Sequence, residues 1–347
     1  MARSLDDPMP HPNHIPQILK SISRTSIGVI GDFCLDAYWE LDQGTPELSL
    51  ETGKPTLAVT RQNYSPGGAG NVAYNLVALG VCRVAVFGVI GNDVFGQELQ
   101  RQMAGFGATN GLTVQRDNWQ TPVYAKPYLG AEEQSRIDFG RFNVLSIDSE
   151  RLLIRQIDEE IKNLDALVIN QQLPRSIFTP SLVECLNTLA QRWPEKVFLV
   201  DARNRIPDFH SMICKLNAVE AAQLFGRGIK DNESASDLDL EHFAEQIFER
   251  SKRPVFITRS KHGILLFDGT ATTRIPAAEI TEPTDPVGAG DTVVAALAAS
   301  LAARSSLKDS AWLATLAAAV TVKKLQQTGT ATPEEILSLS AIAEVNA

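Results

Sequence analysis

The chain has 347 residues, of which 44% are hydrophobic and 21% charged, and this size and composition suit one large α/β domain with insertions. Its formal net charge of −9 and its 32 scattered basic residues exclude a nucleic-acid partner, because such a surface needs clustered Lys and Arg. Its 4 cysteines contain no Cys-x-x-Cys pair, which argues against a structural zinc site.

Residues 1–25 are polar and rich in proline, and they lack the apolar core of a signal peptide. We expect an N-terminal extension there and a cytoplasmic location for the protein. The longest apolar run, 293–303, is too short to cross a bilayer, so no membrane partner is expected.

From residue 26 onward, short segments rich in Val and Ile alternate with segments of helical period. This alternation is typical of a mostly parallel sheet covered on both faces. We predict strands at 26–31, 84–90, 166–170, 197–201, 215–216, 255–259 and 264–267. We predict helices at 71–79, 96–104, 149–163, 179–193, 218–225, 240–251, 291–303, 307–326 and 333–339. One α/β domain is therefore expected over 26–340.

Two stretches, about 37–64 and about 121–142, interrupt this rhythm with turn residues and polar alternation. The pattern predicts exposed antiparallel strands inserted into the α/β body. We expect these strands to form a lid over the site. Because lid strands have free edges, we also expect a homodimer in which each lid pairs with its partner.

The first two candidate sites flank the first insertion. Asp32 and Asp36 follow a predicted strand at the sheet edge where open α/β folds bind ligands; they could hold hydroxyl groups or be two solvated loop acids. Gly67 and Gly68 let the backbone approach a ligand closely, which suits a polyol. Asn71 offers a donor and an acceptor to a sugar hydroxyl, or it is simply the helix N-cap.

Two further candidate sites lie in the middle of the chain. Asp201, Arg203 and Arg205 follow a strand and could recognise a phosphate carried by the substrate; solvated surface arginines are the alternative. Asn217 and Glu220 have the spacing of a capping box, which would only satisfy backbone N–H groups. The functional alternative places Glu220 near a magnesium-bound water beside a triphosphate.

Thr258, Arg259 and Gly263 link two late strands and are the residue types expected near nucleotide phosphates. A plain hairpin turn is the alternative for this segment.

The run Gly288-Ala289-Gly290-Asp291 reads as a glycine turn that opens a helix. Such a turn aims backbone N–H groups at one point, where the positive helix end helps to stabilise a phosphate or an oxyanion. Asp291 in the first helical turn can accept a proton from a hydroxyl that attacks phosphorus, which is kinase chemistry. The alternative is that Asp291 merely caps a buried helix.

In chain order, Gly67-Gly68-x-x-Asn71, Asn217-x-x-Glu220 and Gly288-Ala289-Gly290-Asp291 resemble the ribokinase-like (PfkB) carbohydrate kinases, over about residues 26–337. The resemblance implies a three-layer α/β/α sandwich with a small β lid, ATP with Mg²⁺, and a sugar or sugar phosphate as acceptor. It implies Asp291 as the catalytic base, with an anion hole formed by Gly288, Ala289 and Gly290.

The same resemblance assigns the remaining sites. Asp36, Gly67, Gly68 and Asn71 would contact the sugar. Thr258 and Gly263 would lie by the nucleotide, and Asp285 is a candidate to place a monovalent cation such as K⁺.

Within the family, 31–39 and 136–139 resemble the branch that phosphorylates heptose 7-phosphate at C1. Two segments differ from that branch: Asn170-Gln171-Gln172-Leu173-Pro174-Arg175 replaces an Asp-Tyr-x-Lys-type segment, and Asp201-Ala202-Arg203 stands where a Pro-Lys pair is common. No His-x-Gly-His motif is present, so we expect the kinase without a fused nucleotidyltransferase.

Two alternatives remain open: a kinase for another small sugar or a nucleoside, and a catalytically silent sugar- or nucleotide-binding relative. A dinucleotide oxidoreductase is disfavoured, because no Gly-x-Gly-x-x-Gly follows the first predicted strand.

Overall fold

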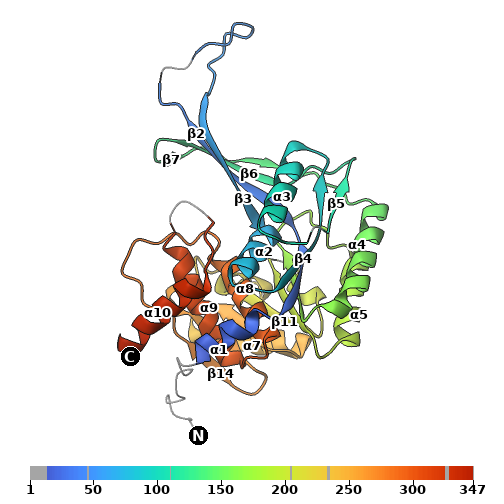
Figure 1. Ribbon diagram of the computed structural model, residues 1–347, viewed down its shortest axis with the longest axis vertical. Helices are drawn as coiled ribbons and strands as arrows, with labels where there is room; N and C mark the ends of the chain where they lie inside the picture. The colour runs from blue at the N-terminus through green and yellow to red at the C-terminus, as the bar shows by residue number, and fades with distance from the viewer. Residues whose placement is uncertain are drawn as a thin grey trace.

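The computed structural model of the protein describes residues 14–44, 47–109, 111–203, 205–232, 235–324 and 328–346. Figure 1 shows an α/β body from which a smaller sheet, at the top of the view, projects as a lid. The described strands of the main sheet are, in spatial order, β14 (Thr272–Ile275), β13 (Ile264–Phe267), β12 (Val255–Thr258), β11 (Ile213–Asn217), β10 (Val197–Ala202), β9 (Ala166–Gln171), β1 (Ser26–Gly31), β4 (Arg83–Gly91) and β5 (Leu112–Gln115).

Neighbouring strands from β5 to β12 are parallel, and β13 and β14 add an antiparallel edge. The predicted mostly parallel sheet is therefore confirmed. The sequence does not reveal the edge strands β5 and β14, because polar residues take half or more of the 4 positions in each. The strands β12 and β13 are equally short, but each contains at least three consecutive apolar residues and is predicted.

Alternation along the central strands separates two apolar cores. Val29 and Val168 face the first core, whereas Ile30 and Ile169 face the second. The first core is covered by α1 (Ile15–Ile22), α2 (Ala69–Ala78), α3 (Val94–Gly105), α8 (Ala289–Ala302), α9 (Leu307–Val322) and α10 (Pro333–Asn346). The second is covered by α4 (Ile147–Glu160), α5 (Pro180–Arg192), α6 (Ala218–Leu224) and α7 (Asp237–Ser251). The fold is thus the expected three-layer sandwich.

Helix α1 lies in the stretch where the sequence predicts only a polar extension. Its apolar residues Ile15, Ile18, Leu19 and Ile22 share one helical face and are buried in the first core. This stretch therefore contributes a packed helix to the body. None of the described helices is long and apolar enough to cross a membrane.

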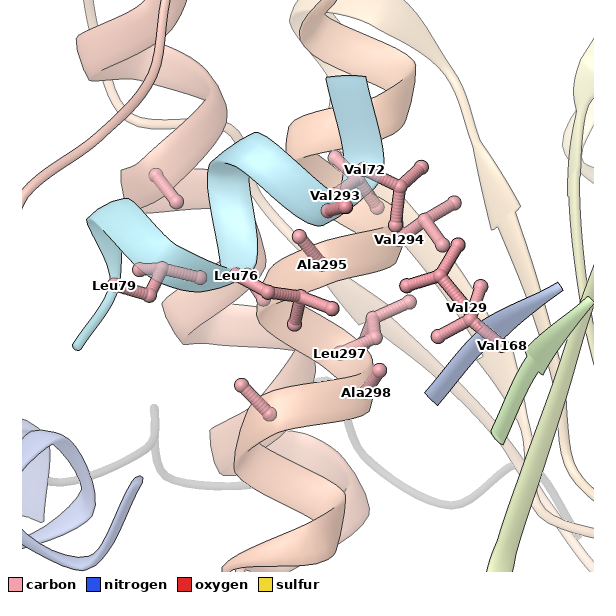
Figure 2. Packing of buried hydrophobic residues seen from close by; sticks show 14 of the residues in the cluster. Val29, Val72, Leu76, Leu79, Val168, Val293, Val294, Ala295, Leu297 and Ala298 are labelled. Carbon is pink, nitrogen blue, oxygen red and sulfur yellow. The ribbon is translucent and has the colours of Figure 1, made fainter. Parts of the chain in front are cut away.

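Helices α2 and α8 pack directly against each other and against the sheet. Figure 2 shows Val72 and Leu76 of α2 beside Val293 and Ala295 of α8, and all four side chains are buried. Both helices start at the same edge of the sheet, where an Asn71–Asp291 hydrogen bond joins their first turns. The packing therefore fixes two distant parts of the sequence side by side.

The lid is a second sheet that contains β3 (Val59–Gly68), β2 (Phe33–Leu41), β6 (Val123–Leu129) and β7 (Glu132–Glu133), with β8 (Ile137–Phe139) paired to β6. The pairs β2–β3, β6–β7 and β6–β8 are antiparallel, as the sequence predicts, but β2 and β6 are parallel. The reason is that β2 continues from β1 and β6 follows β5, and both main-sheet strands point to the same edge. The two insertions therefore leave the body in the same direction.

Candidate active site

The first turn of α8 is built around Gly288, whose φ of +80° is the left-handed conformation that favours glycine. A Cβ at this position would lie 2.9 Å from Thr328 Cγ2 and 3.1 Å from Asn71 Nδ2. Any other residue would therefore displace its neighbours. Glycine here lets the start of α8 approach α2 closely.

The turn predicted to form an anion hole uses one of its backbone N–H groups internally and leaves two without a helical partner. The N–H of Ala289 donates to Pro286 O at 3.2 Å, so this donor is used by the turn itself. The N–H groups of Gly290 and Asp291 lie in the first turn, where an α-helix offers them no carbonyl partner. Together with the positive helix end, these two donors can stabilise an anion.

Asp291 and Asn71 meet although they are 220 positions apart, because Asn71 Nδ2 donates to Asp291 Oδ2 at 2.7 Å. The N-cap position of α2 is Gly68, so the capping alternative for Asn71 is wrong. Asn71 is instead the third residue of α2, with its side chain directed at the first turn of α8.

The amide of Asn71 is held in this orientation by a buried polar network. Asn75 Nδ2 donates to Asn71 Oδ1 at 3.1 Å, and Asn75 Oδ1 accepts from Thr292 Oγ1 at 2.9 Å. Thr292 also lies 3.1 Å from Thr321 of α9, oxygen to oxygen. Because Asn71 Oδ1 is occupied as an acceptor, its Nδ2 must face Asp291.

Burial raises the pKa of the Asp291 carboxyl to about 7. The hydrogen bond from Asn71 and the charge of Lys215 oppose this rise, whereas the carboxylates of Asp201 and Asp36 add to it. A carboxyl group with a pKa near neutrality matches the requirement for a general base.

The sugar-facing residues predicted at the start of the lid are also adjacent. Gly67 pairs with Cys34 across β2 and β3, and a Cβ on Gly67 would lie 2.8 Å from Cys34 Sγ and 2.9 Å from Asp36 Oδ2. The missing side chain therefore keeps the space beside the Asp36 carboxylate open. Gly68 has a φ of +54° where β3 turns into α2.

The Asp36 carboxylate is paired with a lysine that the sequence alone does not point to. Lys126 Nζ lies 2.9 Å from Asp36 Oδ1 and donates to the Tyr38 hydroxyl at 3.3 Å. Lys126 is the partner of Tyr38 in the parallel β2–β6 register. Finding it required that pairing, which no spacing in the sequence encodes.

The Asp32 carboxylate has a structural role. Its carboxylate accepts hydrogen bonds from the N–H groups of Gln172 and Leu173, at 2.8 Å and 2.9 Å, and from Ser176 Oγ at 2.6 Å. Burial raises the pKa of this carboxyl despite these bonds. The idea that Asp32 holds a substrate hydroxyl is therefore wrong; it anchors the loop after β9.

Asp201 is the centre of a second buried polar group. It accepts hydrogen bonds from Lys215 Nζ at 3.0 Å and from the side-chain amides of Asn170 and Gln172, each at 3.2 Å. Arg203 is exposed, and its Nε donates to Gln172 Oε1 at 2.9 Å. The segments that differ from the heptose branch thus contact one another.

The capping box at α6 is confirmed. Asn217 N–H donates to Glu220 Oε2, and Glu220 N–H donates to Asn217 Oδ1, both at 2.8 Å. Burial raises the pKa of the Glu220 carboxyl, against the lowering effect of the Lys215 charge. Among the described residues, no group of three or more His, Cys, Asp or Glu is placed to hold a metal ion.

The late turn serves mainly the fold. The Arg259 guanidinium is buried, lies 2.5 Å from Asp237 Oδ1 and donates to His262 O at 2.9 Å, so it is held by contacts within the fold. Its predicted place near a nucleotide stays a prediction. Gly263 has a φ of +77°, and a Cβ there would lie 2.1 Å from Ile275 O. Thr258 ends β12, where its hydroxyl donates to Leu216 O at 3.3 Å. The hairpin-turn alternative therefore accounts for Arg259 and Gly263.

Asp285 lies before the glycine turn. Its N–H donates to Val322 O at 2.7 Å, and its Oδ1 accepts from Val287 N–H at 3.0 Å. These contacts tie the segment to α9, and a cation at this position stays a prediction.

Comparisons with known proteins agree with this arrangement. The chain is 33% identical over 327 residues to the "Bifunctional protein HldE" of Trichlorobacter lovleyi. The match covers 93% of this chain and 64% of that protein. It is 28% identical to the protein of the same name from Campylobacter curvus, over 92% of this chain and 67% of that one. The chain thus spans about two thirds of the length of these curated relatives.

Solved structures share the fold. Phosphofructokinase-2 from Escherichia coli in complex with potassium superposes with a TM-score of 0.71 at 19% identity, over 92% of this chain and 99% of that chain. Ribokinase from Arabidopsis thaliana complexed with ribose and ATP gives 0.70 at 16% identity, over 91% and 99%. A family model described as pfkB family carbohydrate kinase matches residues 25–335. The chain therefore belongs to the pfkB family of carbohydrate kinases.

Proposed function

We propose that this sugar kinase transfers the γ-phosphoryl group of ATP to the C1 hydroxyl of D-glycero-D-manno-heptose 7-phosphate. The observation that carries the chemistry is the 2.7 Å hydrogen bond between Asn71 Nδ2 and Asp291 Oδ2. It places a group suited to a sugar hydroxyl directly beside a carboxylate suited to accept a proton. The heptose assignment is supported by the segments 31–39 and 136–139 and by relatives at about 30% identity.

In this proposal, the acceptor hydroxyl lies beside Asp291 and loses its proton to that carboxylate as its oxygen attacks phosphorus in line. The free N–H groups of Gly290 and Asp291 stabilise negative charge on the transferred phosphoryl group. Because the transition state is loose, positioning and charge neutralisation supply most of the rate enhancement. Asp36, Asn71 and the backbone of Gly67 and Gly68 hold the sugar against the lid.

ATP would lie on the other side of the anion hole, with Thr258 and Gly263 near the nucleotide and Asn217 and Glu220 near the triphosphate. Mg²⁺ fits here through water, since Glu220 places one carboxylate in the site and magnesium keeps much of its hydration shell. When bound, Mg²⁺ neutralises charge on the phosphates. Asp285 is the proposed position for a monovalent cation; the Escherichia coli phosphofructokinase-2 structure with potassium supports that idea.

A phosphorylated acceptor is supported by the cations at the base of the lid. The Arg136 guanidinium lies 4.6 Å from the centre of the Tyr124 ring. Burial raises the pKa of Tyr124 to about 12, and the positive charges of Arg203 and Arg136 oppose that rise. Arg136 also donates to both carboxylate oxygens of Asp138, at 2.7 Å and 3.1 Å. Two guanidinium groups around one polar point suit a phosphate dianion.

The lid edges are the proposed surface for a homodimer.

A release assay for ADP tests the proposed function. Purified protein is mixed with MgATP and, in separate reactions, heptose 7-phosphate, unphosphorylated heptose, ribose, fructose phosphates and nucleosides. We expect kcat/KM for heptose 7-phosphate to exceed that for the unphosphorylated heptose by about 10² or more, since the phosphate adds charge-assisted contacts. A higher value for any other acceptor contradicts the heptose assignment. Thermal stabilisation by a sugar without ADP release identifies a silent binding protein.

The pH dependence of turnover reports on Asp291. Its pKa is raised to about 7, and only the ionised carboxylate can accept a proton. We therefore expect kcat to rise with pH through about 7 and to fall about tenfold per pH unit below about 6. A profile that stays flat between these pH values argues against Asp291 as the base.

A further inference from the structure

Lys215 is a buried cation next to the anion hole. It lies on β11, its side chain is 5% exposed, and its Nζ is 3.0 Å from Asp201 Oδ1. Within the described part of the chain, Asp201 is the one residue that accepts a hydrogen bond from it. An ammonium group carries three donors, so two N–H groups remain for another partner.

The open side of this ammonium group faces Gly290. The position that a Cβ on Gly290 would take is 3.6 Å from Lys215 Nζ, and no other described atom outside that turn lies within 4 Å of it. Gly290 itself is exposed. The glycine therefore leaves room for one atom, in ordinary van der Waals contact with the ammonium nitrogen, between the anion-hole turn and Lys215.

The charges around this space are unbalanced. Lys215 faces the carboxylates of Asp201 on β10, Glu220 on α6 and Asp291 on α8. Burial lowers the pKa of Lys215, but these three carboxylates outweigh burial and hold its pKa above the ordinary value. Lys215 is therefore protonated at every physiological pH. Without it, a triphosphate would approach three carboxylates that lack this buried cation.

The ammonium group is also fixed in place. Asp201, which holds it, is held in turn by the amides of Asn170 and Gln172, both acting on Oδ2. A donor that is oriented before the reaction loses little free energy to reorganisation and contributes most where charge develops.

We propose that Lys215 is a catalytic residue of this kinase, whose ammonium group donates to a γ-phosphate oxygen of ATP through the gap left by Gly290. This inference rests on the proposed ATP-dependent transfer. It explains why a lysine is buried in the middle of β11, and it assigns Asp201 the role of positioning that lysine.

The test compares Lys215→Met with the double variant Asp201→Asn/Lys215→Met. The single variant leaves the Asp201 carboxylate buried without its cation, which destabilises the fold; the double variant removes the whole ion pair, which folds generally tolerate. We expect Tm to fall in the single variant and to recover in the double variant. Lys20→Met removes a positive charge from the exposed end of α1 and serves as the matched control.

Calorimetric titration with MgATP and MgADP gives the deciding readout. In the double variant we expect ATP affinity to fall about tenfold and ADP affinity to change less than about twofold, because only ATP carries the γ-phosphate. We also expect kcat to stay at least about tenfold below that of the wild type. Equal losses for the two nucleotides, or recovery of kcat together with Tm, overturn the assignment of Lys215. A wild-type protein that binds no ATP contradicts the proposed function itself and the inference with it.

Discussion

The Asp291→Asn variant is expected to turn over about 10² times more slowly than the wild type, or slower still, because an amide cannot accept the proton of the attacking hydroxyl. The substitution keeps the shape of the side chain and an oxygen that can accept from Asn71 Nδ2, so sugar and nucleotide affinities should change little. Steady-state kinetics with saturating ATP measure the loss. Retention of full turnover would show that another group removes the proton.

The same variant should be more stable than the wild type above neutral pH. The pKa of Asp291 is raised from 3.8 to about 7, so the folded protein binds this proton more tightly than the unfolded chain. The free energy of unfolding therefore falls as pH rises from 3.8 to about 7, and Asn, which carries no charge, avoids this loss. Melting temperatures measured across this pH range should show a higher Tm for the variant at pH 8 and the same Tm as the wild type near pH 4.

A matched control is available in α9. Asp309 occupies the first turn of that helix, where its Oδ2 accepts from the Ser306 hydroxyl at 2.7 Å, and it lies outside the proposed site. Asp309→Asn should leave turnover within about twofold of the wild type. A comparable loss in this variant would assign the effect of Asp291→Asn to helix stability instead of catalysis.

The second large effect is expected for Gly68→Ala. Gly68 has a φ of +54°, and a Cβ there would lie 2.6 Å from the backbone oxygen of Asp32. The left-handed conformation and the backbone clash each cost about 1–3 kcal/mol, so the free energy of unfolding should fall by about 3 kcal/mol. Turnover should fall as well, because the turn that must shift carries Asn71. Urea unfolding and kinetics of the folded fraction measure the two losses.

The variant Gly53→Ala in the lid measures the cost of the left-handed backbone conformation without a steric clash. The φ of Gly53, +65°, is similar, but a Cβ there would meet no atom within 4 Å. Gly53→Ala should therefore cost only about 1 kcal/mol, the price of the left-handed conformation alone. If the free energy of unfolding falls by the same amount in both variants, the clash with the Asp32 oxygen contributes nothing to the destabilisation by Gly68→Ala.

The sequence predicts the body of the fold well because its central strands are continuous apolar runs and its helices carry a clear period. The elements that the sequence predicts poorly lack such a run or are too short to show the period. The predicted strand at 215–216 is only the middle of β11, in which Lys215 interrupts the apolar residues Ile213, Cys214 and Leu216. Helix α1 does have helical spacing, at Ile15, Ile18, Leu19 and Ile22, but it is short and follows a proline-rich segment.

The site is predictable only where its chemistry is written in consecutive residues. The glycine turn before Asp291 and the Gly-Gly pair before Asn71 are such motifs, and the fold brings them within hydrogen-bond distance. Lys126 and Lys215 are different, because each is placed by the strand beside it. Arg259 shows the opposite case: its residue type suits a phosphate, but its guanidinium is buried against Asp237.

The chain of polar contacts from Thr321 through Thr292 and Asn75 to Asn71 has a consequence for how this protein could change its acceptor. These contacts tie three helices to the Asp291 carboxylate. Substitution of a residue in this chain is therefore expected to disturb the proposed removal of a proton by Asp291. The opposite wall is the lid, where Lys126 lies on β6 and Arg136 lies directly before β8, and neither residue takes part in this chain of contacts. New sugar preferences should therefore arise by mutation in the lid, while the helical half is inherited unchanged.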